Sequence, residues 1–222
     1  MGSQVFLILR RGERARNKAP PKGRPRNVPA ERSFCYAVGM EGQRTQRTQL
    51  IEQLGSVFQQ QGYDGATLAR LAAVTGLGKA SLYHHFPGGK EEMAQVLVRH
   101  AVANLEQGAF SRLQGRGDPR RRLLDFVDGF CAYAEQGRAN CLLAVLVQGS
   151  ARPLFADQIS AQLRDWQSML AGVFEELGEK PKRAHRSAGQ LLDTLHGSLI
   201  MARLLNDPRH FQQAAKRLRK RL

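Results

Sequence analysis

The sequence has little cysteine and no long hydrophobic run, and these two shortages exclude whole classes of protein. Its 222 residues include only three cysteines, Cys35, Cys131 and Cys141, whose spacing fits neither a disulfide framework nor a metal site. No apolar stretch approaches the roughly 18–20 residues of a membrane span. The apolar run at 5–9 is too short for a signal-peptide core, and its positive charges follow it. We therefore expect a cytoplasmic protein with reduced thiols and no membrane partner.

Acidic residues are also scarce beside the basic ones. The chain carries 34 Lys and Arg against 19 Asp and Glu, a net charge of +15. Nine of the basic residues and two of the acidic ones lie in residues 1–39, so about half of the excess belongs to that segment. An excess of this sign favours polyanions, either nucleic acid or an anionic membrane surface. A membrane surface is disfavoured, because the basic residues do not line one amphipathic face.

Residues 1–43 lack any apolar period and mix Arg, Lys, Pro and Gly. This composition predicts a disordered basic extension. Two interpretations remain open: a basic arm that touches nucleic acid, or a start of translation at Met40 that leaves residues 1–39 outside the native protein. The second is favoured.

From Thr45 onward the apolar spacing is helical and no strand pairs are indicated, so we expect an all-α protein. The first helix runs from Thr45 and ends at Gly62, where a glycine can take the left-handed conformation. Gly and Pro punctuate the remaining helices, which are expected at 67–74, 79–85, from 90 to beyond 102, 119–135, 141–147, 153–177, 182–205 and 208–220.

Two short helices at 68–74 and 79–85, joined by a tight turn at Gly76, predict a helix-turn-helix. Leu82 and Phe86 lie four residues apart on one face of the second helix and predict its buried side. Its other positions carry hydrogen-bond donors, which suit a groove lined by phosphates and base edges. We therefore interpret 79–85 as a recognition helix that enters the major groove of DNA.

The stretch "TLARLAAVTGLGKASLYHHFPGGKEEM", residues 67–93, resembles the DNA-binding signature of the TetR/AcrR family of bacterial transcriptional regulators. The preceding "QLIEQLGSVFQQQGYDGAT" is similar to that family too, and "FPGGKEE" resembles its LmrA/YxaF-like subgroup. The resemblance is strong over about 45–102 and is limited to helix order beyond. Two positions depart from the family pattern: Gly78 replaces a capping Ser, and Thr75 replaces Ala.

The resemblance implies a helix-turn-helix domain at 44–92 and a ligand-binding and dimerisation domain at 93–222. It also implies roles at the DNA. Thr67 and its helix N-terminus would meet a phosphate, as would the point charge of Lys90, while Tyr83 and His84 would donate to backbone oxygens. The residues expected at base edges are Lys79, Ala80 and Ser81.

The same resemblance implies a homodimer on a palindromic operator, since one helix-turn-helix reads one half-site. The last two helices would form the dimer, and its expected contacts are Leu192, Leu195, Leu199 and Leu205. The middle helices would enclose a small hydrophobic effector that releases DNA and so relieves repression. The pocket residues expected from aromatic and methionine content are Phe126, Phe130, Tyr133, Trp166, Met169 and His196, each of which could equally be ordinary core.

The same residues allow other interpretations. A metal site at His84 and His85 is disfavoured, because adjacent helical residues point about 100° apart; His85 is instead expected to pack beside Leu82 and Phe86. A redox or electrophile sensor acting through Cys131 or Cys141 is the alternative function. No Ser/His/Asp set, carboxylate pair or nucleotide loop is present, so we expect no enzyme, no metal and no cofactor.

Overall fold

The computed structural model describes the backbone of residues 30–222 and the side chains from Gln46 onward, and residues 43–222 form one compact unit. The predicted basic extension lies outside the described residues over 1–29. Over 30–43 the backbone is helical and continues into the first helix, whereas the composition of that segment predicted no regular structure. No proline interrupts residues 30–86, and extending an existing helix is easier than nucleating a new one.

The all-α prediction is confirmed over residues 30–222, where no strand is present. Helix α1 spans Ala30–Gly65 but is interrupted at Gly62, whose φ of 69° and ψ of 178° are not helical. The first helix was predicted to end at Gly62. In the structure Gly62 instead interrupts the helical backbone inside α1. Gly62 takes a positive φ without strain because it has no Cβ.

The next three helices follow α1 in the order expected for a helix-turn-helix. Helices α2 (Leu68–Thr75) and α3 (Lys79–His85) are joined through Gly76, which has a φ of 68°. Helix α4 (Gly89–Gly108) then runs without interruption past the predicted domain boundary at 92/93. The division into two domains at that point stays a prediction.

The remaining helices form the second part of the unit. They are α5 (Pro119–Tyr133), α6 (Leu142–Leu146), α7 (Arg152–Glu176), α8 (Pro181–Leu204) and α9 (Arg209–Arg221), with short 3-10 turns η1 (Phe110–Leu113), η2 (Glu135–Gly137) and η3 (Gly149–Ala151). Pro119, Pro153 and Pro181 each occupy the first turn of a helix, where the missing N–H has no intrahelical partner to lose.

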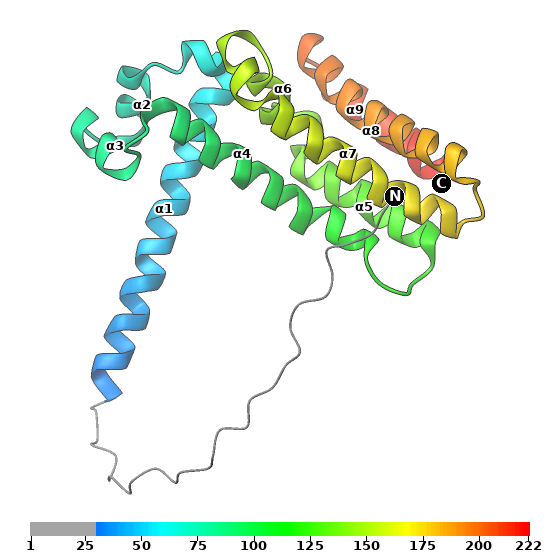
Figure 1. Cartoon of the computed structure of the whole chain (residues 1–222), viewed down its shortest axis with the longest axis horizontal. Helices are drawn as coiled ribbons and strands as arrows, with labels where there is room; N and C mark the ends of the chain where they lie inside the picture. Colours follow the sequence, from blue (N-terminus) through cyan, green and yellow to red (C-terminus); the bar gives the residue numbers. More distant parts are fainter. Residues whose placement is uncertain (1–29) are drawn as a thin grey trace, which may run out of the picture. The chain divides into compact units, whose positions relative to one another are not determined.

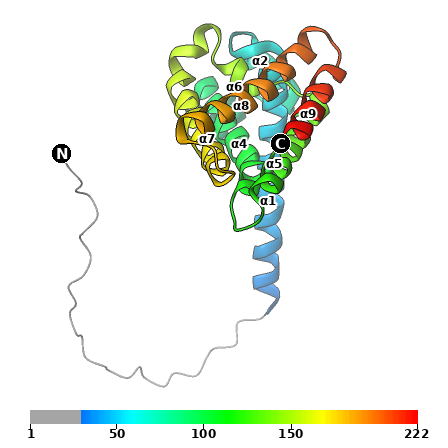
Figure 2. The same cartoon turned by 90° about the vertical axis from the view of Figure 1, so that its right-hand side faces the viewer.

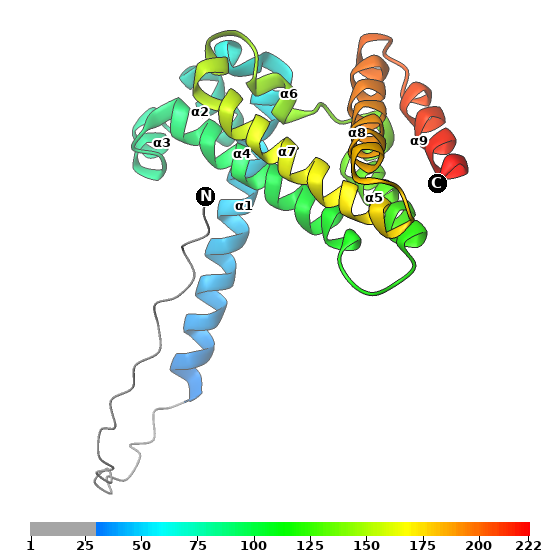
Figure 3. The ribbon, with the colours of Figure 1, turned by 45° about the vertical axis from the view of Figure 1, so that its right-hand side comes forward.

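Within residues 43–222, α2 and α3 gather at one end, and α8 and α9 lie at the other (Figures 1 and 3). Helices α4 and α7 run side by side between the two ends (Figure 3). Figure 2 shows α7 and α9 on either side of α8. The arrangement leaves α3 far from the C-terminal helices.

The core of the second part is built on aromatic rings. The Phe110 ring stacks on the Trp166 indole at a centroid distance of 4.7 Å and meets the Phe126 ring edge-on at 4.8 Å. All three side chains are fully buried. Helix α5 approaches this cluster closely, because a Cβ on Gly129 would lie 2.2 Å from the carbonyl oxygen of Gly108. A glycine at 129 is therefore required by packing.

Candidate nucleic-acid interface

Threonine hydroxyls hold both ends of α2, and the one at its C-terminal end also contacts the turn that leads to α3. The Thr67 hydroxyl oxygen caps the helix by accepting a hydrogen bond from the Arg70 backbone N–H at 3.3 Å. The Thr75 hydroxyl donates to the Leu71 carbonyl at 2.8 Å and accepts from the Leu77 backbone N–H at 3.4 Å. Thr75, a departure from the family pattern, thus contributes contacts of its own to the turn.

Helix α3 divides into a buried and an exposed side as the sequence predicts. Leu82 and the following Phe86 are fully buried, whereas every other residue of α3 is exposed. Among them are the predicted DNA-facing residues Lys79, Ala80, Ser81, Tyr83 and His84. The N-cap position, Gly78, makes no side-chain capping bond.

His85 is not the packed histidine that we expected. Its side chain is exposed, and its ring meets the Phe86 ring only at a centroid distance of 6.4 Å. Because α3 has just two turns, the stripe through Leu82 and Phe86 occupies its whole buried side, and position 85 falls beyond the edge of that stripe.

Tyr83 is held against the start of α4. Gly89 has a φ of 65°, and a Cβ at that position would lie 3.3 Å from Tyr83 Cε1. The Tyr83 ring therefore rests on the Gly89 backbone, which only a glycine allows in this form. The adjacent Gly88 N–H donates to the Glu92 carboxylate at 2.7 Å, which satisfies one of the free donors at the start of α4. The "GGKEE" motif thus supports a recognition-helix side chain.

Lys90 is the predicted phosphate contact whose position is most restricted. Its Nζ donates to the Tyr63 carbonyl at 3.2 Å and lies 4.2 Å from the centroid of the Tyr63 ring. A cation over an aromatic face is held by the ring quadrupole. The ammonium group is thereby fixed near the end of α1, and it keeps donors for a further acceptor.

Sequence reasoning missed two arginines beside these helices. Arg47 in α1 places its guanidinium 5.9 Å from the centroid of the Phe86 ring, next to α3. Arg70 in α2 donates to the Gly65 carbonyl at 2.9 Å and to the Gln61 side chain at 3.2 Å. Arg47 lies outside the motif at 67–93, and its exposed position near the start of the apolar pattern is the signal that indicates it.

Two side-chain clamps join α1 to the segment that contains α6. Before α6, the Asn140 amide donates to the Gln59 carbonyl at 3.0 Å, and the Gln59 amide donates to the Asn140 carbonyl at 3.3 Å. After α6, the Asp64 carboxylate accepts hydrogen bonds from the Ser150 hydroxyl and, at 3.2 Å, from its backbone N–H. These bonds lower the pKa of Asp64. Helix α6 is therefore tied at both ends to the helix that precedes the helix-turn-helix.

The six residues expected to line an effector pocket do not come together. Phe126, Phe130 and Trp166 are fully buried and pack against other rings, and Met169 is exposed. Tyr133 lines a small cavity of about 420 Å³ beside α1 and α4, while His196 lines a different and larger groove. Their role at an effector stays a prediction: the buried aromatic rings fill the core, and the groove that His196 lines takes its apolar walls from aliphatic residues.

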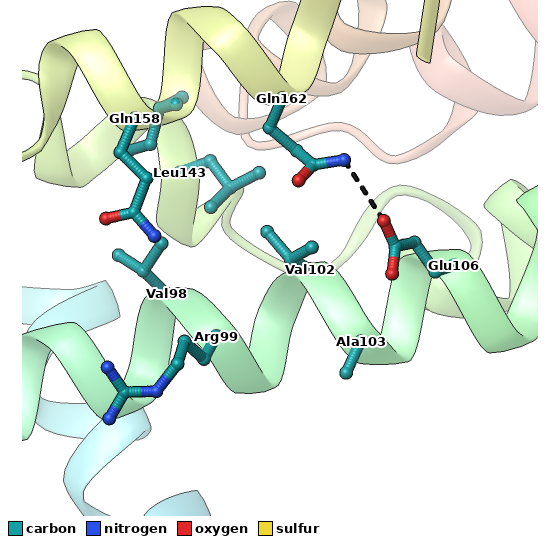
Figure 4. Close-up of a pocket in the computed structure, with 9 residues that line it drawn as sticks. Val98, Arg99, Val102, Ala103, Glu106, Leu143, Gln158 and Gln162 are labelled. Carbon is teal, nitrogen blue, oxygen red and sulfur yellow. Dashed lines mark hydrogen bonds between the residues drawn. The ribbon is translucent and has the colours of Figure 1, made fainter. Parts of the chain in front are cut away.

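That groove has a volume of about 810 Å³ and lies between α6, α7 and α8. On the other side of α7, a smaller hollow of about 220 Å³ separates it from α4 (Figure 4). Val98 and Val102 point from α4 toward α7 there, and Gln162 of α7 donates to the Glu106 carboxylate at 3.0 Å (Figure 4). Helix α7 thus contacts α4 on one side and borders the large groove on the other.

The predicted dimer contacts on α8 are mostly core residues of the protomer. Leu192, Leu195 and Leu199 are buried against neighbouring helices, and only Leu205 of the predicted set is exposed. The three buried leucines offer a partner little surface, and their part in a dimer stays a prediction. The exposed apolar residues at the end of α8 are instead Ile200, Met201, Leu204 and Leu205.

Both cysteines with described side chains are buried. Burial raises the pKa of the Cys131 thiol, and the guanidinium of Arg219, 3.4 Å from its sulfur, opposes that shift only in part. Burial also raises the pKa of Cys141. A buried thiol with a raised pKa is a poor nucleophile. Within residues 30–222 no helix combines the length and apolar character needed to cross a bilayer.

Two family models match this chain. One, described as bacterial regulatory proteins of the tetR family, matches residues 50–97, and the other, described as the C-terminal domain of LmrA/YxaF-like transcriptional regulators, matches residues 126–217. The first match ends within α4 and contains α2 and α3, and the second runs from α5 into α9. Both families consist of transcriptional regulators rather than enzymes, which confirms the expectation that this chain is not an enzyme.

Individual relatives agree with this assignment. The HTH-type transcriptional regulator LmrA of Bacillus subtilis is 24% identical over 161 residues, which cover 70% of this chain and 85% of that protein. A TetR transcriptional regulator from Chloroflexus aurantiacus has the same fold, with a TM-score of 0.67, 24% identity and coverage of 82% and 95%. AibR, solved in complex with isovaleryl coenzyme A and operator DNA, matches with a TM-score of 0.52 at 19% identity, over 68% of this chain and 86% of that one.

Proposed function

Because the chain belongs to the TetR family of bacterial regulatory proteins, we propose that it is a repressor that binds a palindromic operator as a homodimer and is released by a small apolar effector. Its place of action would be the cytoplasm, where bacterial DNA lies. The observation that carries the DNA-binding part is the exposed polar side of α3, which packing within the protomer does not use.

The proposed DNA contacts fall into two groups. Lys79, Ala80 and Ser81 stand at the exposed N-terminal end of α3, the part of a recognition helix that reaches base edges. Thr67, Tyr83, His84 and Lys90 surround it and would bind phosphates, which fix the register of the protein on the duplex. The net charge of +15 would add attraction that is independent of sequence.

A dimer is needed because one α3 reads a single half-site. We place its apolar contact at the exposed end of α8, where Ile200, Met201, Leu204 and Leu205 are neighbours on successive turns. Contiguous exposed apolar side chains on a soluble protein commonly mark an interface. Leu204, the most exposed of them at 74%, would be the central contact.

Release by an effector requires a ligand that binds the two conformations of the protein with different affinity. AibR, which has this fold, was solved with both an acyl coenzyme A and operator DNA, and this supports an effector for the present chain. The clamps at Gln59–Asn140 and Asp64–Ser150 supply a physical connection from α6 to the DNA-binding helices. The alternative of a thiol sensor is weaker, because Cys131 and Cys141 are buried with raised pKa values.

The test is to titrate the protein into duplex DNA from the promoter region of its own gene. Binding is monitored by fluorescence anisotropy at two salt concentrations. Lys79→Ala should weaken binding to a preferred sequence more than binding to unrelated DNA. Lys216→Ala, a matched change of an exposed lysine on α9, should leave both affinities unchanged. Equal effects of the two substitutions would exclude α3 as the recognition helix.

A further inference from the structure

The groove between α6, α7 and α8 has apolar walls contributed by all three helices. Its volume is about 810 Å³, and its aliphatic lining residues are Leu143, Ala144, Val147, Ala156, Ile159, Leu163 and Leu192. These side chains suit an apolar chain rather than a polar ligand. The buried aromatic cluster of the core does not line it, and of the six pocket residues expected from the sequence only His196 does.

Two arginines of α7 border the same groove. Arg152 and Arg164 both line it, and within the described part of the chain neither guanidinium has a hydrogen-bond or ion-pair partner. One carboxylate, Asp193 of α8, also lines the groove. The lining therefore carries an excess of positive charge, in the form of planar guanidinium groups that match a carboxylate or phosphate.

A histidine adds a second polar group to the groove. The His196 ring lies between the Cys141 sulfur, 3.8 Å from its Nδ1, and the Phe130 ring, 4.9 Å away between centroids. Its Nε2 is buried and has no hydrogen-bond partner among the described residues. Burial lowers the pKa of His196 to about 4, so the imidazole is neutral at pH 7. A neutral ring with one nitrogen at the thiol keeps the other as an unused polar group beside the groove.

We propose that this groove binds an amphiphile with an aliphatic tail and an anionic carboxylate or phosphate head, the tail lying on the α6 wall and the head paired with either Arg152 or Arg164, which stand about three turns apart on α7. The inference deepens the proposed function and rests on it, since it names the chemical class of the effector. It follows from the coincidence of apolar walls and two guanidiniums without a described partner in one groove.

The position of the groove connects the binding of a ligand there to the DNA-binding helices. Cys141, Leu143, Ala144 and Val147 of its wall belong to α6 or directly adjoin it. Asn140 and Ser150 flank the same segment and clamp it to α1. A tail that pushes on α6 therefore acts on the helix that leads into the helix-turn-helix.

The test measures direct binding of dodecanoate, dodecyl phosphate and dodecanol to the full chain by calorimetry, below their micellar concentrations. We expect the two anions to bind and the alcohol to bind at least about fivefold more weakly, because it lacks the charge. One of the substitutions Arg152→Gln and Arg164→Gln, at the arginine that holds the head group, should weaken binding of the anions by about fivefold and leave binding of the alcohol unchanged. Arg116→Gln, an exposed arginine in the loop before α5, is the matched control. The better of the two anions identifies the head group.

Ala156→Trp should fill the groove and abolish binding of all three probes, with circular dichroism and DNA affinity as for the unsubstituted chain. Equal affinity for dodecanol and the anions, or no effect of either Arg substitution, would overturn the assignment. So would loss of the dimer in Ala156→Trp, since the groove would then be an interface between copies. Anion binding that leaves DNA affinity unchanged would support the groove as a site and contradict only the effector part of the proposed function.

Discussion

The hydroxyl of Tyr83 is the smallest group on which the proposed DNA interface can be tested. The side chain is 46% exposed, and its ring is positioned by Gly89 rather than by the core. Tyr83→Phe removes one hydrogen-bond donor to a DNA phosphate and no packing contact. We expect affinity to fall about three- to tenfold for operator and unrelated DNA alike, since a net hydrogen bond contributes about 0.5–1.5 kcal/mol. Gel shifts with both DNAs measure this.

The control for that substitution is Tyr133→Phe. Tyr133 lies in the second part of the unit, half-buried beside Asn140 and far along the chain from α3. Its variant should bind DNA as the unsubstituted chain does. Unchanged affinity in Tyr83→Phe would remove that residue from the interface.

His196 makes stability depend on pH. Its pKa is lowered to about 4 by burial, an effect that the charge of Asp193 only partly opposes, against 6.5 in the unfolded chain. The unfolded state therefore binds the extra proton first as pH falls. The stabilising contribution is complete above about pH 6.5 and declines from there toward pH 4. We expect this residue alone to lower the free energy of unfolding by about 2 kcal/mol between pH 7.5 and pH 5.

Urea unfolding at the two pH values, compared with His196→Gln, isolates this residue from the other five histidines. The variant should lose less stability on acidification than the unsubstituted chain. An identical pH dependence in both would show that His196 is solvated or already charged.

At the scale of elements, the junction of α3 and α4 depends on the backbone of Gly89. Its φ of 65° is costly for any residue with a Cβ, and that Cβ would press on the Tyr83 ring. Gly89→Ala should lower the free energy of unfolding by about 1–2 kcal/mol and weaken DNA binding by displacing Tyr83. Chemical denaturation and anisotropy titration measure the two effects.

Gly172→Ala on α7 is the matched control, because a Cβ there meets open space. Removing a glycine from a helix in this setting should raise stability by about 0.5–1 kcal/mol and leave DNA binding unchanged. Weakened DNA binding in both variants would mean that the effect of Gly89→Ala is not specific to the junction.

The sequence predicted the long helices well and the cavities poorly, for one physical reason. Apolar period and proline or glycine at the ends are local, so α7 and α8 were expected to within one residue of their observed bounds. Local periodicity says that Leu195 and Trp166 are buried, but not what covers them. Trp166 packs on Phe110, 56 positions away, and Leu195 packs within its own protomer.

Helix α3 was more predictable than the groove between α6, α7 and α8, because its motif is continuous. Every DNA-facing residue expected in α3 is exposed, as a seven-residue helix with one buried stripe requires. The groove collects residues from three helices that are separated by up to 55 positions, and its aliphatic lining resembles any core face. Composition alone could not distinguish the lining of this groove from an ordinary core face.

For the molecule as a whole, reading a palindromic operator requires two copies of the chain. Leu204→Glu places a charge on the most exposed apolar residue of α8. We expect it to dissociate the dimer at micromolar concentration, as measured by light scattering, because burying an unpaired charge at an interface is unfavourable. Binding to a full palindrome should fall more than binding to a single half-site.

Leu177→Glu, at the exposed end of α7, is the control and should leave the dimer intact. A chain that remains dimeric with glutamate at position 204 would show that the interface lies elsewhere than the end of α8.

Selection of bound duplexes from a random DNA pool by the purified full chain tests the central claim most directly, since it requires no knowledge of the target. The account predicts enrichment of an inverted repeat whose half-sites are about one helical turn apart or a multiple of it, with enrichment lost for Lys79→Ala combined with Ser81→Ala. Enrichment of a single unrepeated site would contradict the dimer. A pool that shows no enrichment at low salt would contradict sequence-specific DNA binding by α3.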